Sequence, residues 1–374
     1  MWQTNVLDSS QMLQGNENRA ILDALVHGYR AGQRNMRLDR LSGQDALNYA
    51  DQLLRVSQVT LKVGQLETSS EFLQACSGVV ESIQKSANRK KNVAEWLILL
   101  AARDLQHARL LLAGNDPTTA LAYVDQVKKR IGSQSPRQLD KTAKLKTLRL
   151  TADADQLGAE ACYIKYRRGP RMMEAIELCL HEIPIRQYIK DQSDSDLDRI
   201  ALARALGWLG LSLYKTAYEL DDYFALRLKQ LGLSIPNNYP DILDLALAEL
   251  SLLRDRESSA ALLAKGEIQN TLGLALSFTD TQRSIAINLD NLKSYQQLSE
   301  RFPMLVEHQV QVARSYGNLA QSYQRAADKD RYFLSLSQCF ENYCRLLDEF
   351  GVQRDVIADI CIHGVELYYT AKYE

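Results

Sequence analysis

The chain is poor in the residues that interrupt regular secondary structure. Its 374 residues include only 7 prolines and 18 glycines, too few for an all-β or loop-rich fold. Val, Ile and Thr are sparse beside Leu, Ala, Gln and Arg, which favour helices. The hydrophobic fraction of 46% is ordinary for a folded protein and provides a sizeable core. We therefore expect an almost entirely helical protein.

Long apolar runs and paired cysteines are also missing. The longest apolar stretches, such as WLILLAA (96–102), fall far short of the ~20 residues that a membrane span needs. The N-terminus, MWQTNVLDSSQ, has no basic region followed by an apolar core. None of the six cysteines belongs to a Cys-x-x-Cys pair or a zinc-knuckle spacing. These absences predict a cytoplasmic protein with no membrane segment and with buried, free thiols.

Catalytic and metal-binding motifs are missing as well. HEIPI (181–185) begins like a zinc-protease helix, but Ile185 stands where the second histidine is required, and Pro184 is expected to disrupt the helix. No phosphate-binding loop, Gly-x-Ser-x-Gly elbow or kinase loop occurs. No two of the five histidines share a helix face. We expect no metal, no cofactor and no enzymatic activity.

The net charge of −1 is unevenly divided. Residues 1–190 carry 27 Lys/Arg against 20 Asp/Glu, or +7, and residues 191–374 carry 18 against 26, or −8. The basic clusters NRKKN (88–92), KKRIGSQSPR (128–137) and YRRGPR (166–171) fall at expected turns, so solvated loop charge is the simpler interpretation. A nucleic-acid surface would need basic residues and stacking aromatics on one face. Nucleic acid is therefore an unlikely partner.

What the sequence does contain is the apolar periodicity of helices that come in pairs. The expected pairs are 46–64 with 66–85, 92–114 with 117–131, 140–169 with 170–183, 258–277 with 279–301, and 305–327 with 330–350; a further first helix, 196–220, has its partner 241–253 displaced by an irregular insertion at 232–240, and a last helix, 354–373, would cap the stack. Short turns join the helices of a pair. Asp116 stands at an N-cap position, Pro117 at the first helical position and Gly114 at the preceding helix end, and Gly169 and Pro170 repeat this pattern.

The first helices share a cadence of a large residue, Leu, a small residue and another large residue one turn later. It is written in ARALGWLGLSLY (203–214), EIQNTLGLALS (267–277) and RSYGNLAQSYQ (314–324). All four positions lie on one helix face, where the small Gly273 or Ala320 lets the neighbouring helix approach closely. Helix pairs that recur about every 50 residues are typical of an α-solenoid. We predict an all-α, right-handed superhelical solenoid of antiparallel helix pairs.

This cadence resembles the tetratricopeptide repeat, most closely over 258–350 and recognisably over 92–131 and 199–214. The units here are longer, at 46–55 residues, than the family's unit of about 34. Long units that close on LSERFP (298–303) also resemble the divergent repeats appended to bacterial signalling kinases and caspase-like proteases. The expected organisation is N-terminal capping helices at 1–41, basic divergent repeats at 42–190, a fourth unit with an insertion at 191–257, and the most regular repeats with a C-terminal cap at 258–374.

The resemblance implies a concave groove formed mainly by the first helix of each pair. Carried over residue by residue, it places these side chains in the groove: Arg204; Glu267, Asn270 and Leu274; and Arg314, Gly317, Gln321 and Arg325. Such groups can hold the backbone amides or a carboxylate of an extended segment. For any one of these residues taken singly, an ordinary solvated helix position is the simpler interpretation.

The expected function is a non-enzymatic scaffold or regulatory subunit that binds a partner protein or peptide through this groove. An effector enzyme encoded nearby is one candidate partner. The alternative is a ligand- or peptide-sensing module that controls such an effector, because small rotations between neighbouring units add up along a solenoid. RNA binding through the basic N-terminal half comes third, and an unrecognised enzyme last.

Overall fold

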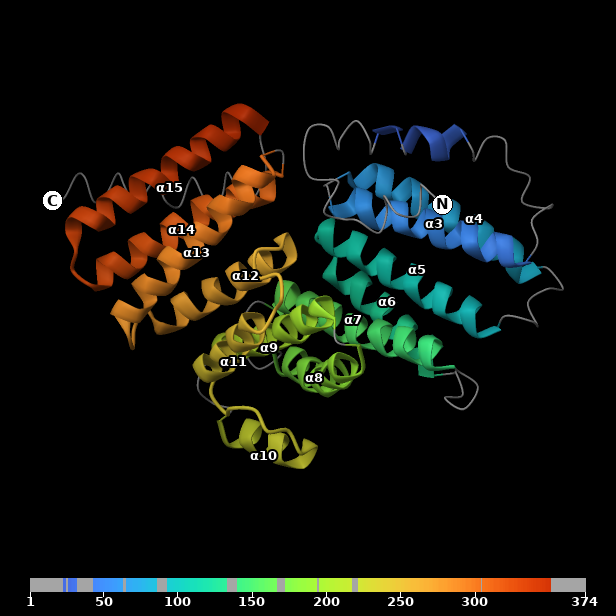
Figure 1. Ribbon diagram of the computed structural model, residues 1–374, viewed down its shortest axis with the longest axis horizontal. Helices are drawn as coiled ribbons and strands as arrows, with labels where there is room; N and C mark the ends of the chain where they lie inside the picture. The colour runs from blue at the N-terminus through green and yellow to red at the C-terminus, as the bar shows by residue number, and fades with distance from the viewer. Residues whose placement is uncertain are drawn as a thin grey trace. The chain divides into compact units, whose positions relative to one another are not determined.

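The chain is almost entirely helical in the part that the computed structural model describes. That part comprises residues 23–24, 26–31, 43–62, 65–85, 93–132, 140–166, 172–193, 195–216, 221–303 and 305–350. Within these ranges there is no strand (Figure 1). The predicted all-α fold of neighbouring helix pairs is confirmed. The predicted helix at 354–373, the turn at Gly169 and most of the predicted caps at 1–41 lie outside the described residues.

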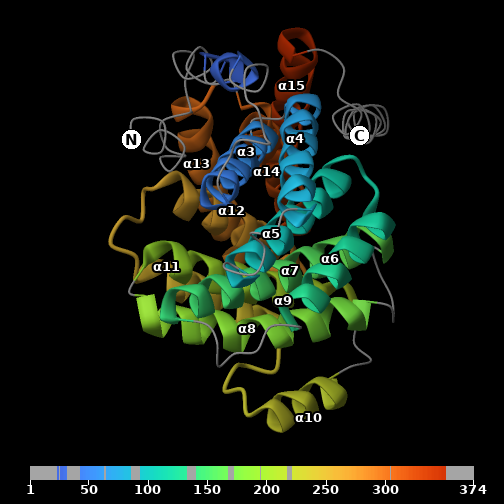
Figure 2. The same ribbon diagram turned by 90° about the vertical axis from the view of Figure 1, so that its right-hand side faces the viewer.

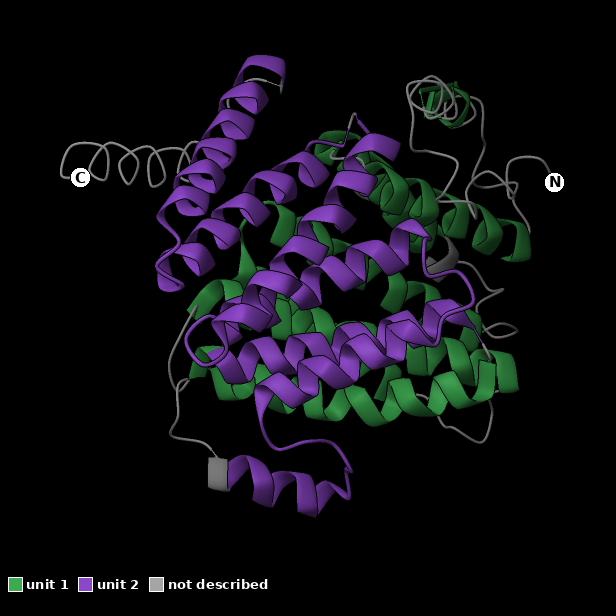
Figure 3. Cartoon of the chain, turned by 60° about the vertical axis from the view of Figure 1, so that its left-hand side comes forward, with its two compact units in different colours: residues 1–13, 17–194, 215–220 green, residues 14–16, 195–214, 221–374 purple. Residues whose placement is uncertain are grey.

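Two compact units divide the chain (Figure 3). Unit 1 comprises residues 1–13, 17–194 and 215–220, and unit 2 comprises residues 14–16, 195–214 and 221–374. The boundary near residue 195 lies at the start of the fourth predicted first helix. Each unit has its own clusters of buried apolar side chains.

Unit 1 contains three of the predicted pairs. They are α3 (Gly43–Lys62) with α4 (Leu66–Lys85), α5 (Val93–Ala113) with α6 (Pro117–Gly132), and α7 (Lys141–Tyr166) with α8 (Met173–Ser193). The two helices of each pair pack along one another, and α4 packs on α5 as α6 does on α7. Fully buried side chains such as Leu53, Phe72 and Leu105 fill the interfaces. Each pair therefore buries its apolar face partly against the next pair.

The helices from α9 onward belong to unit 2, apart from the last two residues of α9. They are α9 (Asp196–Thr216), α10 (Asp221–Leu231), α11 (Tyr239–Ser251), α12 (Ser259–Leu276), α13 (Thr281–Arg301), α14 (Val306–Arg325) and α15 (Lys329–Phe350). The pairs α12–α13 and α14–α15 pack closely, and α13 packs on α14. Figures 1 and 2 both show α10 apart from the other helices of its unit.

Two predictions about local structure are wrong. Pro184 does not disrupt its helix: α8 runs through it to Ser193, and the proline ring lies on an exposed position. Proline lacks the N–H that would bond to the preceding turn, and its ring crowds the carbonyl four residues earlier, but packing of α8 against α7 maintains the helix on both sides. The irregular insertion is also shorter than expected. Asn238 caps α11 by accepting from the N–H of Asp241, so only 232–238 is non-helical.

Aspartate starts the second helix of several pairs, as predicted at Asp116. Its Oδ1 accepts from the N–H of Thr119 at 3.1 Å, and Asp328 and Asp280 bond in the same way to the third residue onward. Gly114 does lie at the end of α5, but the left-handed residue is Asn115, with φ 61°. The N–H groups of Asn115 and Asp116 bond back to Leu112 and Leu111. One three-residue turn thus closes one helix and opens the next.

The predicted close approach at small residues is confirmed. A Cβ built on Gly210 would lie 2.7 Å from Leu243 Cδ2 of α11, and one built on Gly273 would overlap the Asn288 side chain of α13. Ala320 is buried at the equivalent place on α14. A first helix therefore meets its own second helix at this position, where a larger side chain has no room.

No helix in the described ranges is long and apolar enough to cross a membrane.

Candidate functional site

The predicted groove residues come from three first helices of unit 2: α9, α12 and α14. We call this set the first-helix face: residues 204, 267, 270, 274, 314, 317, 321 and 325. Because the residues are spaced by about one helical turn along each helix, they follow one side of it. The structure brings several of them into direct contact between helices.

A row of charged groups crosses the N-terminal half of this face. The Arg204 guanidinium donates two hydrogen bonds to the Glu267 carboxylate, from Nε and Nη2, both at 3.0 Å. Beneath them Tyr295 of α13 is almost fully buried. Burial raises the pKa of its hydroxyl, and the nearby charge of Glu267 acts in the same direction, against those of Arg204 and Arg314. The charges of Arg204, Glu267 and Arg314 are therefore all close enough to act on the Tyr295 hydroxyl.

An amide pair forms the next row. The side-chain N–H of Asn318 donates to Oδ1 of Asn270, 48 residues earlier on α12. Asn318 was not among the predicted residues, because the carried-over pattern selects position 317. Gly317 itself is buried and presents no side chain.

A cation–aromatic contact occupies the C-terminal end of the face. The Arg325 guanidinium carbon lies 3.5 Å from the centroid of the Phe278 ring, and its Nη1 donates to Oγ of Ser277. Phe278 is an exposed aromatic side chain, so the arginine covers one of its faces. Partial burial lowers the pKa of Arg325, although the guanidinium remains charged at neutral pH. Arg325 thus contacts its own chain rather than projecting freely as the sequence suggested.

Of the remaining predicted members, Leu274 and Gln321 fall between the second and third rows along the sequences of α12 and α14. Leu274, Arg314 and Gln321 are half-buried. The contacts join Arg204 to Glu267, Asn270 to Asn318, and Arg325 to Ser277 and Phe278, so Asn318, Ser277 and Phe278 are added to the set. The available signal was the repeat length, because the residues of both bonded pairs are 48 positions apart, close to one repeat.

A second polar cluster lies in unit 1 and was not predicted. Asp104 of α5 is fully buried and pairs with Arg103 (Oδ1 to Nη2, 2.7 Å) and with Arg130 of α6 (Oδ2 to Nε, 2.5 Å). Asp155 of α7 is also fully buried. Its carboxylate pairs with Lys128 Nζ at 2.6 Å and accepts from His181 Nδ1 at 2.5 Å. These contacts tie α5 to α6, and both α6 and α8 to α7.

Glu182 and Arg186 extend this cluster along α8. Arg186, itself buried, donates from Nε to Glu182 at 2.9 Å and from Nη2 to Asp153 of α7 at 2.7 Å. Burial raises the pKa of Glu182 to about 8, more than Arg186 lowers it. The interaction with Asp155 raises the pKa of His181, whose ring is largely exposed. Acidic residues on an otherwise apolar helix stripe, as in AARDLQH (101–107), were the available signal.

The ion pairs of this cluster account for part of the positive charge in the N-terminal half of the sequence. Lys128 and Arg130, two of the three cations that open the cluster at 128–137, are paired with buried aspartates. Only Lys129 of that trio is an exposed side chain. The clusters at 88–92 and 167–171 lie outside the described residues. In the described part of unit 1, much of the positive charge is therefore neutralised internally and stabilises the fold.

The cysteines in the described part of the chain are free thiols. Cys76, Cys162, Cys179 and Cys339 are buried free thiols, as predicted, and Cys344 is half-buried. Among the described residues, no group of three or more His, Cys, Asp or Glu side chains is arranged to hold a metal ion.

Comparison with known proteins gives only a distant likeness of fold. No protein-family model matches the chain, and no curated protein matches its sequence. Among solved structures, the nuclear import adaptor Nro1 of S. pombe is similar over 86% of this chain and 100% of its own, with 12% sequence identity and a TM-score of 0.45. A likeness at this level carries no argument about function.

Proposed function

We propose that this protein is a non-enzymatic, tetratricopeptide-like scaffold or regulatory subunit that binds an extended segment of a partner protein along the first-helix face. An effector enzyme encoded nearby is the partner class we favour. The support is one observation: polar side chains of α9, α12 and α14, which are far apart in sequence, meet in successive rows. Arg204 with Glu267, Asn318 with Asn270, and Arg325 with Ser277 form these rows.

The rows keep unused hydrogen-bonding capacity. A side-chain amide has two N–H donors and an acceptor oxygen, and a guanidinium has five N–H donors. The contact between Asn270 and Asn318 uses one donor and one acceptor of the pair. The other groups can bond the N–H and C=O groups of an extended segment, or a carboxylate, without first breaking the contacts that align them. Such pre-alignment lowers the entropic cost of binding.

Two arginines offer the direct test of this proposal. A peptide selected from a random display library on the full chain is titrated against wild type and the double variant Arg314→Glu with Arg325→Glu. Reversing both charges should weaken binding more than tenfold, about 1.4 kcal/mol, because both groups face the same segment. Loss of the Arg325–Phe278 contact should cost only about 0.5–1 kcal/mol of stability, which a thermal melt measures.

The matched control carries the same charge change on a second helix. Lys329→Glu with Arg345→Glu, both on α15, should bind the peptide within twofold of wild type. An affinity that survives the first-helix reversal contradicts the proposal. If changes at the exposed Lys129 and Lys144 of unit 1 then abolish binding, the basic half of the chain is the binding surface.

A further inference from the structure

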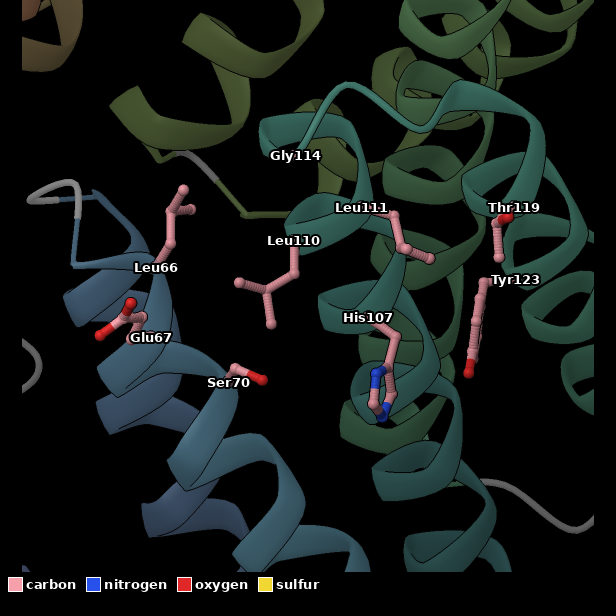
Figure 4. Close-up of a pocket in the computed structure, with 9 residues that line it drawn as sticks. All are labelled: Leu66, Glu67, Ser70, His107, Leu110, Leu111, Gly114, Thr119 and Tyr123. Carbon is pink, nitrogen blue, oxygen red and sulfur yellow. The ribbon is translucent and has the colours of Figure 1, made fainter.

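An open pocket of about 440 Å³ lies in unit 1, outside the first-helix face (Figure 4). It is bounded by the first turns of α4, the C-terminal half of α5 and the start of α6. Figure 4 shows Leu66 and Glu67 on the α4 side, Tyr123 on the α6 side, and Leu110 and His107 of α5 between them. Its volume is in the range of small-molecule sites.

The floor of the pocket is apolar. Leu110 and Leu111 of α5 are half-buried, and Leu66 of α4 keeps 41% of its surface exposed. Together they present aliphatic surface that a ring could cover, at a gain of roughly 25 cal/mol for each Å² removed from water. A ligand with an apolar body therefore gains free energy here.

One wall is a stacked pair of rings. His107 and Tyr123 are nearly parallel, at 19°, with ring centroids 5.1 Å apart. Burial and the nearby charge of Arg103 lower the pKa of His107, so its imidazole is neutral at pH 7. A neutral imidazole offers one nitrogen as a hydrogen-bond acceptor. The wall therefore carries no positive charge that would repel a cation.

The opposite wall of the pocket, formed by α4, carries a carboxyl group. Among the described residues that line the pocket, Glu67 is the one with a carboxyl group, and it forms no ion pair with any described residue. Ser70, one turn along α4, adds a hydroxyl. An apolar floor with a single carboxylate at its edge selects for a cation with an apolar body and disfavours an anion.

We propose that this pocket binds a small aromatic amine, with its ring on Leu110 and His107 and its ammonium group on the Glu67 carboxylate. Binding here is independent of the partner segment proposed for unit 2. Because no described group neutralises Glu67, the ammonium gains a charge-assisted hydrogen bond without displacing an existing partner.

Three probes that share one ring system test this proposal on the full chain. They are tryptamine, neutral 3-ethylindole and anionic indole-3-propionate, measured by calorimetric titration and by amide chemical shifts. Tryptamine should bind with a dissociation constant on the order of 1 mM or tighter, as expected for a ligand of its size. It should bind at least tenfold more tightly than indole-3-propionate, with 3-ethylindole in between. Shifts should gather at 66–70 and 107–123.

A matched pair of variants on α4 isolates the carboxylate. Glu67→Gln should weaken tryptamine binding about tenfold and leave 3-ethylindole unchanged, whereas Glu81→Gln, the same change at an exposed position about four turns along the helix, should alter neither. Leu110→Trp, which fills the pocket from a half-buried position, should reduce binding of both probes. Three results overturn the proposal: equal binding of the amine and the acid, tryptamine binding that Glu67→Gln does not change, or no binding of any probe.

Discussion

At the scale of single residues, unit 1 is notable for the carboxylates that it buries. Asp104 and Asp155 each have two cationic partners, but Glu182 has only Arg186, which Asp153 shares. Removing a carboxylate from water favours its protonated form unless partners compensate. The protonation of Glu182 therefore changes near neutral pH, unlike that of an ordinary glutamate.

Unit 1 should lose stability as pH rises from 6 to 8. The folded pKa of Glu182 is raised to about 8 from an unfolded value near 4.5. Between pH 6 and 8 the folded state therefore still binds a proton that the unfolded state has already released. Stability is then greatest at the low end and falls as pH rises towards 8, by about 2 kcal/mol between pH 6 and 8. His181 adds to this trend, because its raised pKa gives a contribution that is lost as pH rises. Urea unfolding at the two pH values measures the change.

The control for this prediction is Glu182→Gln, which mimics the protonated side chain. Its amide oxygen can still accept from Arg186 Nε. The variant should unfold with a much flatter dependence on pH, and at pH 8 it should be more stable than wild type. Equal slopes in the two proteins would show that Glu182 is ionised throughout and paired more strongly than its burial suggests.

At the scale of helices, the space around each glycine decides how its helix packs. Gly273 meets Asn288 across the α12–α13 crossing, with no room for a Cβ, whereas Gly78 in the middle of α4 has no atom within 4 Å of its Cβ position. Replacing Gly273 or Gly78 with alanine should therefore change the stability of the protein in opposite directions. Gly273→Ala should destabilise by about 1–3 kcal/mol through overpacking, and Gly78→Ala should stabilise by about 0.5–1 kcal/mol through helix propensity. Chemical denaturation of both variants tests this, and a stabilised Gly273→Ala would disprove the close crossing.

The helices themselves could be predicted because their signals are local. Asp116 precedes Thr119 by three residues, and the apolar positions of α12 repeat within a turn, so neighbouring letters of the sequence suffice. The contact of Arg204 with Glu267 spans 63 residues and depends on how two helices are rotated, which no local pattern contains. The same holds for His181 and Asp155. Pro184 was misjudged because tertiary packing outweighs a local propensity.

At the scale of the whole molecule, each unit is stabilised by contacts between neighbouring helices. The buried clusters around Leu53 and Leu105 lie in unit 1, and those around Leu319 and Tyr343 lie in unit 2. In such an array, stability is approximately a sum of local terms and nearest-neighbour terms. A change in one core should thus be felt most in its own unit.

Hydrogen exchange of the full chain measures this localisation. Leu319→Ala, at a side chain only 2% exposed, should cost about 2–5 kcal/mol and reduce amide protection in α12–α15 while leaving α3–α6 close to wild type. Leu105→Ala in α5 should give the reverse pattern. Equal loss of protection in both units from either variant would mean that the chain unfolds as one cooperative body.

The buried contacts of Ser284 and Asn288 determine which helix can lie beside α13. Both side chains bond to Ser322 Oγ of α14, at 2.9 and 3.0 Å, and Ser284 also donates to the Gly273 carbonyl of α12. On α12 the position 47 residues before Ser322 is Ala275, which has no hydroxyl. If α12 of a second chain replaced α14 here, Ser284 and Asn288 would each lose a bond to Ser322, worth about 0.5–1.5 kcal/mol per bond. Apolar faces that repeat along a chain could exchange neighbours, and this serine favours α14 over α12 as the helix beside α13.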